Sequence, residues 1–180
     1  MLSFGVGACG FAAVAAYDIA QVRHRRRLAL VSAIAGYLCL AASLTVVIVS
    51  YSPAKDSFIL LLLKILFAAG FFVLLLYSVL IEIPLALRRS RPSPAQARKV
   101  ISSGTYGIVR HPGFLWFALM WGAIILIYLN PVVTRVGLGL VSLDFLLIAA
   151  EDLVFFPRIF SDYEEYRKRI PFIVPRFRMR

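Results

Sequence analysis

The sequence predicts an all-α polytopic membrane bundle with five transmembrane helices and a C-terminal amphipathic helix at the membrane surface. Of its 180 residues 61% are hydrophobic, and the mean hydropathy is +0.86, well above the values usual for soluble domains. Several apolar runs reach about 20 residues, which is long enough to cross a bilayer as a helix. The formal net charge of +11 is concentrated in short segments between these runs and in the tail. It therefore indicates membrane topology rather than nucleic-acid binding.

The first three apolar runs predict transmembrane helices over Leu2–Val22, 28–50 and 58–87. The first run is rich in Gly and Ala, which favours close packing against another helix. No basic residue precedes it, and this disfavours a cleaved signal peptide. Cys9 and Cys39 lie inside the runs with no spacing typical of a disulfide or metal framework. We interpret both cysteines as small apolar residues.

The last two apolar runs predict helices over 113–129 and 136–156. The following segment, 157–170, predicts one amphipathic helix lying on the membrane surface. Its apolar and aromatic face is formed by Ile159, Tyr163, Tyr166 and Ile170. Pro171 ends this helix, and the apolar residues 172–174 are expected to turn back against the bundle.

The basic residues follow the first, third and fifth runs, whereas the loops at 51–57 and 130–135 are poor in charge. The positive-inside rule therefore predicts an outside N-terminus and a cytoplasmic C-terminus. We expect one membrane domain over 1–180. It consists of three N-terminal spans in 1–87, a cytoplasmic segment in 88–112, and the last two spans with the tail in 113–180.

The segment from Gly104 to Pro112 is the first candidate site. Two glycines flank Tyr106 and allow a tight turn, and Pro112 suits the first turn of the next helix. His111 is then expected at the loop edge beside free backbone donors, where it contributes little to packing. Arg110 offers a planar fork suited to a carboxylate. The same two residues would equally serve as ordinary cytoplasmic charges next to a membrane helix, so both interpretations remain open.

Acidic residues in the last apolar run form the second candidate site. Asp144 and Glu151 are seven residues apart and share one helical face. Asp144 lies about 18 Å from the cytoplasmic end of the run. A carboxylate at that depth is costly and is a functional candidate. A structural hydrogen bond to another helix is the alternative for Asp144.

Taken in order, these elements resemble a known family. The pattern Gly104-x-Tyr106-x-x-Val109-Arg110-His111-Pro112, then Glu151-Asp152, then Tyr163-x-x-Tyr166 with Pro171 and Pro175 is similar to the isoprenylcysteine carboxyl methyltransferases. That family belongs to a wider group of integral-membrane methyltransferases which includes phospholipid methyltransferases. The resemblance covers residues 102–175, and the first three spans match only in general character.

The resemblance implies S-adenosylmethionine bound at the cytoplasmic face, between the last two spans and the tail. We expect catalytic roles for Arg110 and Glu151, which lie in the matching motifs, and for Asp144, which is a candidate because of its depth in the apolar run; no metal is expected. The acceptor would be a lipophilic molecule entering from the bilayer, in the first instance a carboxylate of the isoprenylcysteine type. The residues expected to bind the cofactor are Tyr106, Val109, Arg110, His111, Pro112, Glu151, Tyr163, Tyr166 and Pro171.

Some positions depart from the family pattern and leave the acceptor open. Gly113-Phe114 replaces a bulkier residue followed by Tyr, Asp152 replaces a frequent second Glu, and Ser161 replaces a common Gly. A prenylated cysteine, a fatty or isoprenoid acid and a phospholipid amine all remain as acceptors. An NADPH-dependent membrane sterol-type reductase is a further alternative, disfavoured because 115–117 carries no acid there. A non-catalytic membrane scaffold, which would bind no cofactor, is the last alternative.

Overall fold

The computed structural model describes residues 1–82 and 99–175, and within these ranges every regular element is a helix. The predicted all-α class is therefore confirmed for the described residues. The elements are α1 (Leu2–Val22), α2 (Arg26–Ser50), α3 (Phe58–Leu76), η1 (Tyr77–Glu82), η2 (Gly104–Gly107), α5 (Pro112–Tyr128), α6 (Pro131–Ala150), η3 (Glu151–Phe155), α7 (Phe156–Ile159) and α8 (Tyr163–Arg169).

Four helical stretches in the described residues are long and apolar enough to cross a membrane. They are Leu2–Val22, Arg26–Ser50, Phe58–Glu82 and Pro131–Ile159. The predicted fourth span corresponds to α5, which is also apolar but has only 17 residues. The predicted end of the third span at 83–87, and the basic residues in 88–98, lie outside the described residues.

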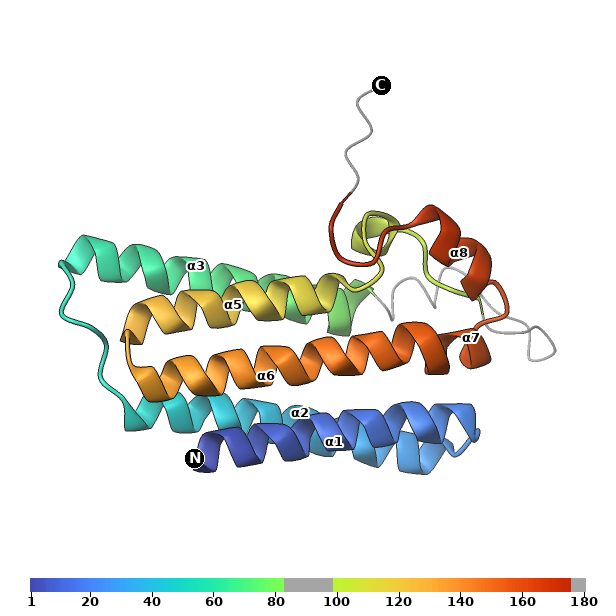
Figure 1. Ribbon diagram of the computed structural model, residues 1–180, viewed down its shortest axis with the longest axis horizontal. Coiled ribbons are helices and arrows are strands. Elements are labelled where there is room, and N and C mark those ends of the chain that lie inside the picture. Colours follow the sequence, from blue (N-terminus) through green and yellow to red (C-terminus); the bar gives the residue numbers. More distant parts are fainter. Residues whose placement is uncertain (83–98, 176–180) are drawn as a thin grey trace, which may run out of the picture.

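The long helices form a bundle in which α6 is central (Figure 1). The α1–α2 pair packs on one side of α6, and α5 packs on the other side with α3 beyond it. None of the residues of α3 is buried, so this helix presents a wide apolar surface outward. The core between the helices consists of Phe11, Val47, Phe117, Met120, Trp121, Ile124, Val133, Val136 and Leu140.

The expected close packing of the first span is present between α1 and α2. A Cβ atom at Gly10 would lie 3.0 Å from the carbonyl oxygen of Gly36. A Cβ at Gly36 would lie 2.8 Å from a methyl group of Val14. The two backbones thus approach at a distance that larger residues would not allow.

The fifth predicted span begins earlier than expected, at Pro131 instead of 136. The side chain of Asn130 accepts hydrogen bonds from the backbone N–H groups of Val132 and Val133, and so caps the first turn of α6. Pro131 occupies the first turn, where its fixed φ is compatible with a helix. Arg135, which we expected in a loop, therefore lies within the helix.

The single tail helix predicted over 157–170 is wrong. The structure has the short helix α7, an interruption at 160–162, and then α8. Phe160 is extended, with φ −116° and ψ 125°, and the Asp162 side chain accepts a hydrogen bond from the Val100 N–H instead of capping α8. This break turns α8 back over the end of the bundle, beside the loop that precedes α5 (Figure 1).

Candidate functional site

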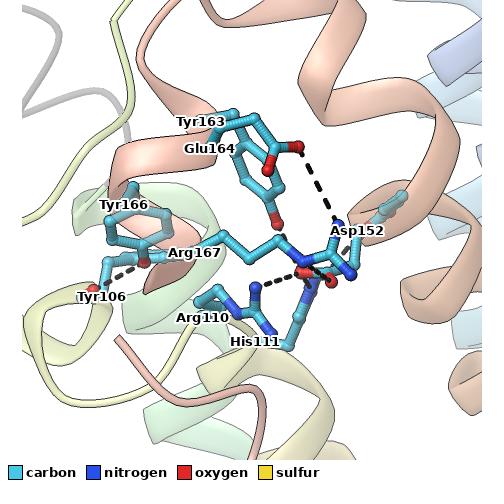
Figure 2. Close-up of polar contacts among 9 residues, drawn as sticks. Tyr106, Arg110, His111, Asp152, Tyr163, Glu164, Tyr166 and Arg167 are labelled. Carbon is cyan, nitrogen blue, oxygen red and sulfur yellow. Dashed lines mark hydrogen bonds and ion pairs between the residues drawn. The ribbon is translucent and has the colours of Figure 1, made fainter. Parts of the chain in front are cut away.

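Asp152 lies at the centre of a buried polar cluster (Figure 2). It belongs to η3, the π-helical turn that follows α6, and its neighbours come from the loop before α5 and from α8. Its Oδ1 accepts a hydrogen bond from the Tyr163 hydroxyl at 2.6 Å and lies 3.2 Å from Nη1 of Arg110. Its other oxygen lies 3.5 Å from Nε of Arg167. One carboxylate therefore balances two guanidinium groups.

The residues after α8 hold the loop before α5 by its backbone. The N–H of Arg110 donates to the carbonyl of Pro171 at 2.9 Å, and the N–H of His111 donates to the carbonyl of Phe172 at 3.3 Å. The Phe172 ring lies 5.4 Å from the Arg110 guanidinium carbon, within reach of a cation–π contact. The expectation that residues 172–174 turn back against the bundle is confirmed at Phe172.

His111 is buried, with only 5% of its surface exposed, so the expectation that it lies at the loop edge is wrong. Its ring stacks on Phe156 at 5.8 Å and meets Phe172 edge-on at 5.1 Å. Its Nε2 lies 3.5 Å from Oδ1 of Asp152. Burial lowers the pKa of the imidazole, although the nearby Asp152 carboxylate opposes this shift. The neutral ring is thus favoured near pH 7.

The two tail tyrosines are buried and point their hydroxyl groups in different directions (Figure 2). Tyr163 donates to Asp152, whereas Tyr166 donates to the backbone carbonyl of Tyr106 at 2.6 Å. Burial raises the pKa of both phenols, and the hydrogen bond to Asp152 raises that of Tyr163 further. Both therefore remain protonated donors, and together they attach α8 to η3 and to the Gly104–Gly107 turn.

Glu82, a residue that the sequence did not single out, holds the Gly104–Gly107 turn from the end of η1. Its carboxylate accepts a hydrogen bond from the Thr105 N–H at 2.7 Å and another from the Thr105 hydroxyl. Gly104 has φ +62°, and a Cβ there would collide with the Glu82 carboxylate. Only glycine fits both the left-handed backbone and this close approach. Burial raises the pKa of Tyr106, and Glu82 adds to the effect.

Glu151 precedes Asp152 in the chain but has different neighbours. Its Oε2 lies 3.6 Å from Nδ1 of His111. It also interacts electrostatically with Asp18 of α1 and with Asp144. Asp18 is 2% exposed and was missed by the sequence analysis. An acid inside the first apolar run was the signal that could have found it.

A cavity of about 350 Å³ opens beside Arg110. Its wall combines basic side chains with apolar ones from the tail, and Nε of Arg110 is buried with no hydrogen-bond partner among the described residues. Such a donor fits an anionic group of a ligand. The residues around the cavity are Arg110, Arg167, Lys168, Ile170, Pro171, Phe172, Ile173 and Val174.

The remaining predicted residues serve the loop rather than the cavity. Val109 is buried, and Pro112 occupies the first turn of α5. Asp144 belongs to α6 and interacts electrostatically with Glu151. The structure thus brings together the predicted residues of the loop before α5, of η3 and of the tail. Asp144 is connected to this group through its interaction with Glu151. Their assignment to cofactor binding and catalysis stays a prediction.

No group of three or more His, Cys, Asp or Glu side chains is arranged to hold a metal ion in the described part of the chain. Comparison of the whole sequence and structure with protein-family profiles, curated proteins and solved structures gives no match in any of the three.

Proposed function

We propose that the protein is an S-adenosylmethionine-dependent integral-membrane methyltransferase that acts on a lipophilic acceptor. The observation that carries the proposal is the arrangement of Arg110 beside the cavity: its Nε and Nη1 are buried without a hydrogen-bond partner among the described residues, and Nη1 lies 3.2 Å from Oδ1 of Asp152. This is a preorganised site for the carboxylate of a small zwitterionic ligand. The order of sequence motifs supports the same assignment.

The residues around the cavity fit the other parts of such a cofactor. Its apolar walls, from Ile170, Phe172 and Val174, suit a nucleoside, because aromatic and aliphatic groups cover a base well. When bound, the cofactor supplies an electrophilic methyl group on a sulfonium sulfur. Arg110 orients the ligand, the buried His111 keeps water from the inner end of the site, and Tyr163 fixes the Asp152 carboxylate.

The proposal places this site at the cytoplasmic membrane face. The distribution of basic residues supports an outside N-terminus and a cytoplasmic C-terminus. We include α5 as a fifth span, because its 17 apolar residues lie beside α3 within the bundle. In this arrangement α8 rests on the surface, and the acceptor reaches the site laterally from the bilayer.

Calorimetry on the detergent-purified protein tests the proposal, with S-adenosylmethionine, its demethylated product and NADPH as separate ligands. We expect saturable binding of the two sulfur compounds. Arg110→Gln should weaken that binding about tenfold to a hundredfold, because a charge-assisted hydrogen bond is lost. Arg158→Gln removes the same charge from an exposed position outside the cavity and is the matched control.

Binding of NADPH without either sulfur compound would reject the methyltransferase in favour of a reductase. Binding of none of the three would leave a non-catalytic scaffold. His111→Gln is preferable to His111→Ala as a second variant, because the buried ring packs between Phe156 and Phe172 and its removal would also affect folding.

A further inference from the structure

The turn that joins α1 to α2 is a compact patch of positive charge. Of the five residues from 23 to 27, four are arginines and the other is His24, and all five are exposed. We refer to residues 23–27 as the basic turn. It connects two helices that are each long and apolar enough to cross a membrane, which places it at a membrane surface. It lies at the same end of the bundle as α7 and α8 (Figure 1).

The backbone of the basic turn is held in a defined geometry. The N–H of Arg25 donates to the carbonyl of Ala20 at 2.9 Å, and the N–H of His24 donates to the carbonyl of Gln21 at 3.1 Å. His24 has φ +54°, the left-handed conformation that commonly closes the last turn of a helix. The arginines are therefore carried by a fixed connection between two packed helices and not by a free tail.

No acid neutralises this charge in the described part of the chain. None of the arginines of the basic turn forms an ion pair there, and Asp18, the nearest acid along the chain, is buried. At the candidate site, by contrast, Arg110 and Arg167 both lie close to the Asp152 carboxylate. The basic turn therefore presents unbalanced positive charge to its surroundings.

An exposed apolar strip continues from the basic turn along the first turns of α2. Its residues Leu28, Leu30 and Val31 are between 49% and 64% exposed. In a membrane such side chains contact acyl chains, while arginines at the end of the same span reach the level of the lipid headgroups. Membrane orientation needs only the positive charge. The combination of this charge with an exposed apolar strip also matches the two parts of a phospholipid molecule.

The chemistry of the arginines selects among the polar groups found at a membrane surface. A guanidinium is permanently charged and binds two oxygens of one phosphate through parallel N–H groups. Clusters of basic residues next to a membrane span attract lipids with a net negative charge. A zwitterionic phospholipid also carries an ammonium group, which the arginines would repel. A free phosphate ion would leave the apolar strip without a partner.

We propose that the basic turn binds the phosphate of an anionic phospholipid, whose acyl chains lie along Leu28, Leu30 and Val31. The site shares no residue with the cavity beside Arg110, and the inference does not depend on the proposed methyltransferase activity. Because α1 also contacts η3 and α7, a lipid bound at the basic turn should stabilise the bundle as a whole.

The experiment compares three ligands on the whole chain, purified in a neutral detergent: dioleoylphosphatidylglycerol, dioleoylphosphatidylcholine and inorganic phosphate. Affinity is measured from the rise in thermal midpoint with ligand concentration. We expect saturable stabilisation by the anionic lipid, about tenfold weaker binding of the zwitterionic lipid, and no effect of phosphate. An increase in ionic strength from about 0.05 M to about 0.5 M should weaken the binding of the anionic lipid, because exposed charges are screened.

Three variants test whether the basic turn is responsible. Arg26→Gln should weaken binding of the anionic lipid about fivefold, the contribution of one basic residue beside a membrane span. Arg26→Lys keeps the charge without the fork and should recover most of that loss, which separates an effect of charge from damage to the fold. Arg169→Gln removes an exposed arginine of α8 at the same end of the bundle, and this matched control should bind like the wild type.

Equal stabilisation by the two lipids would overturn the inference, and so would equal stabilisation by inorganic phosphate. A loss in Arg169→Gln as large as that in Arg26→Gln would also overturn it, because binding would then reflect the general charge of this end of the molecule. No recovery in Arg26→Lys would mean that the loss in Arg26→Gln is structural and would reject the site. If Arg26→Gln does not fold, Arg23→Gln, which lies outside both helices, decides by the same criterion.

Discussion

Glu151 and Asp152 are adjacent in the chain and have opposite electrostatic surroundings. Asp152 faces the tail, where Arg110 and Arg167 neutralise it and Tyr163 donates a hydrogen bond to it. Glu151 interacts with the carboxyl groups of Asp18 and Asp144, and it shares the His111 ring with Asp152. The π-helical turn η3 sends the two side chains to different sides of the same helix end.

The two residues therefore mark a region in which opposite charges are paired and a region in which acidic groups have no basic partner. The tail side has cations and anions in contact, so its charges serve to hold the loop, η3 and α8 together. The bundle side has acids without a Lys or Arg ion-pair partner in the described residues, so no cation there compensates for their burial. A carboxylate paired with cations and a carboxyl group without a Lys or Arg partner among the described residues thus belong to adjacent residues.

The largest expected effect contrasts Asp152→Asn with Asp18→Asn. Asp152→Asn leaves the Arg110 guanidinium, whose side chain is 9% exposed, without its buried counter-ion. We expect a loss of about 3–5 kcal/mol in the free energy of unfolding. Asp18→Asn removes a buried acid from among other acids, so stability should stay equal or rise. Thermal unfolding in detergent measures both, and equal losses in the two variants would contradict the distinction.

A smaller effect separates the two hydroxyl groups of α8. Tyr163→Phe removes a hydrogen bond to a charged oxygen and should cost about 1.5–3 kcal/mol, whereas Tyr166→Phe removes one to a neutral carbonyl and should cost about 0.5–1.5 kcal/mol. Denaturation of the two variants under identical conditions provides the comparison. The reverse order would mean that the Gly104–Gly107 turn, rather than Asp152, holds α8 in place.

The smallest effect is a pH dependence that arises on the tail side. Burial holds the pKa of His111 below its ordinary value of 6.5, so the unfolded chain takes up a proton at a higher pH than the folded one. The resulting stability is fully present above pH 6.5 and is lost as the pH falls through the folded-state pKa. The slope from this one group cannot exceed about 1.4 kcal/mol per pH unit. Unfolding measured from pH 8 to pH 5 should be less steep in His111→Gln, and identical slopes would exclude this origin.

The helical spans, and the residues that form the polar cluster around Asp152, were predictable from the sequence. Long apolar runs specify helices through hydropathy alone, and Arg110, His111, Tyr163 and Tyr166 belong to segments that the chain order places at one end of the bundle. The break at 160–162 was not predictable, because it depends on Asp162 bonding to the distant Val100 N–H in place of capping its own helix. The helix propensities of the tail residues give no information about that contact.

Asp18 and Glu82 could not be assigned for a related reason. Asp18 lies near the end of an apolar run and close to basic residues, which is also the pattern of an acid at a membrane interface. Its burial depends on how α1 rotates against α6, which the weakly amphipathic sequence of α1 does not specify. Glu82 bonds to Thr105 across a long stretch of chain, and no spacing rule connects the two.

The bond between Glu82 and Thr105 also determines how the Gly104–Pro112 segment can be engineered. The segment reads as a self-contained motif, yet its first turn is closed by a carboxylate from the end of another helix and by the Tyr166 hydroxyl from the tail. A transplant of the motif into another helical bundle would therefore need both partners at matching positions. Replacement of the Phe58–Glu82 helical stretch by one from another bundle would equally have to retain an acid at position 82.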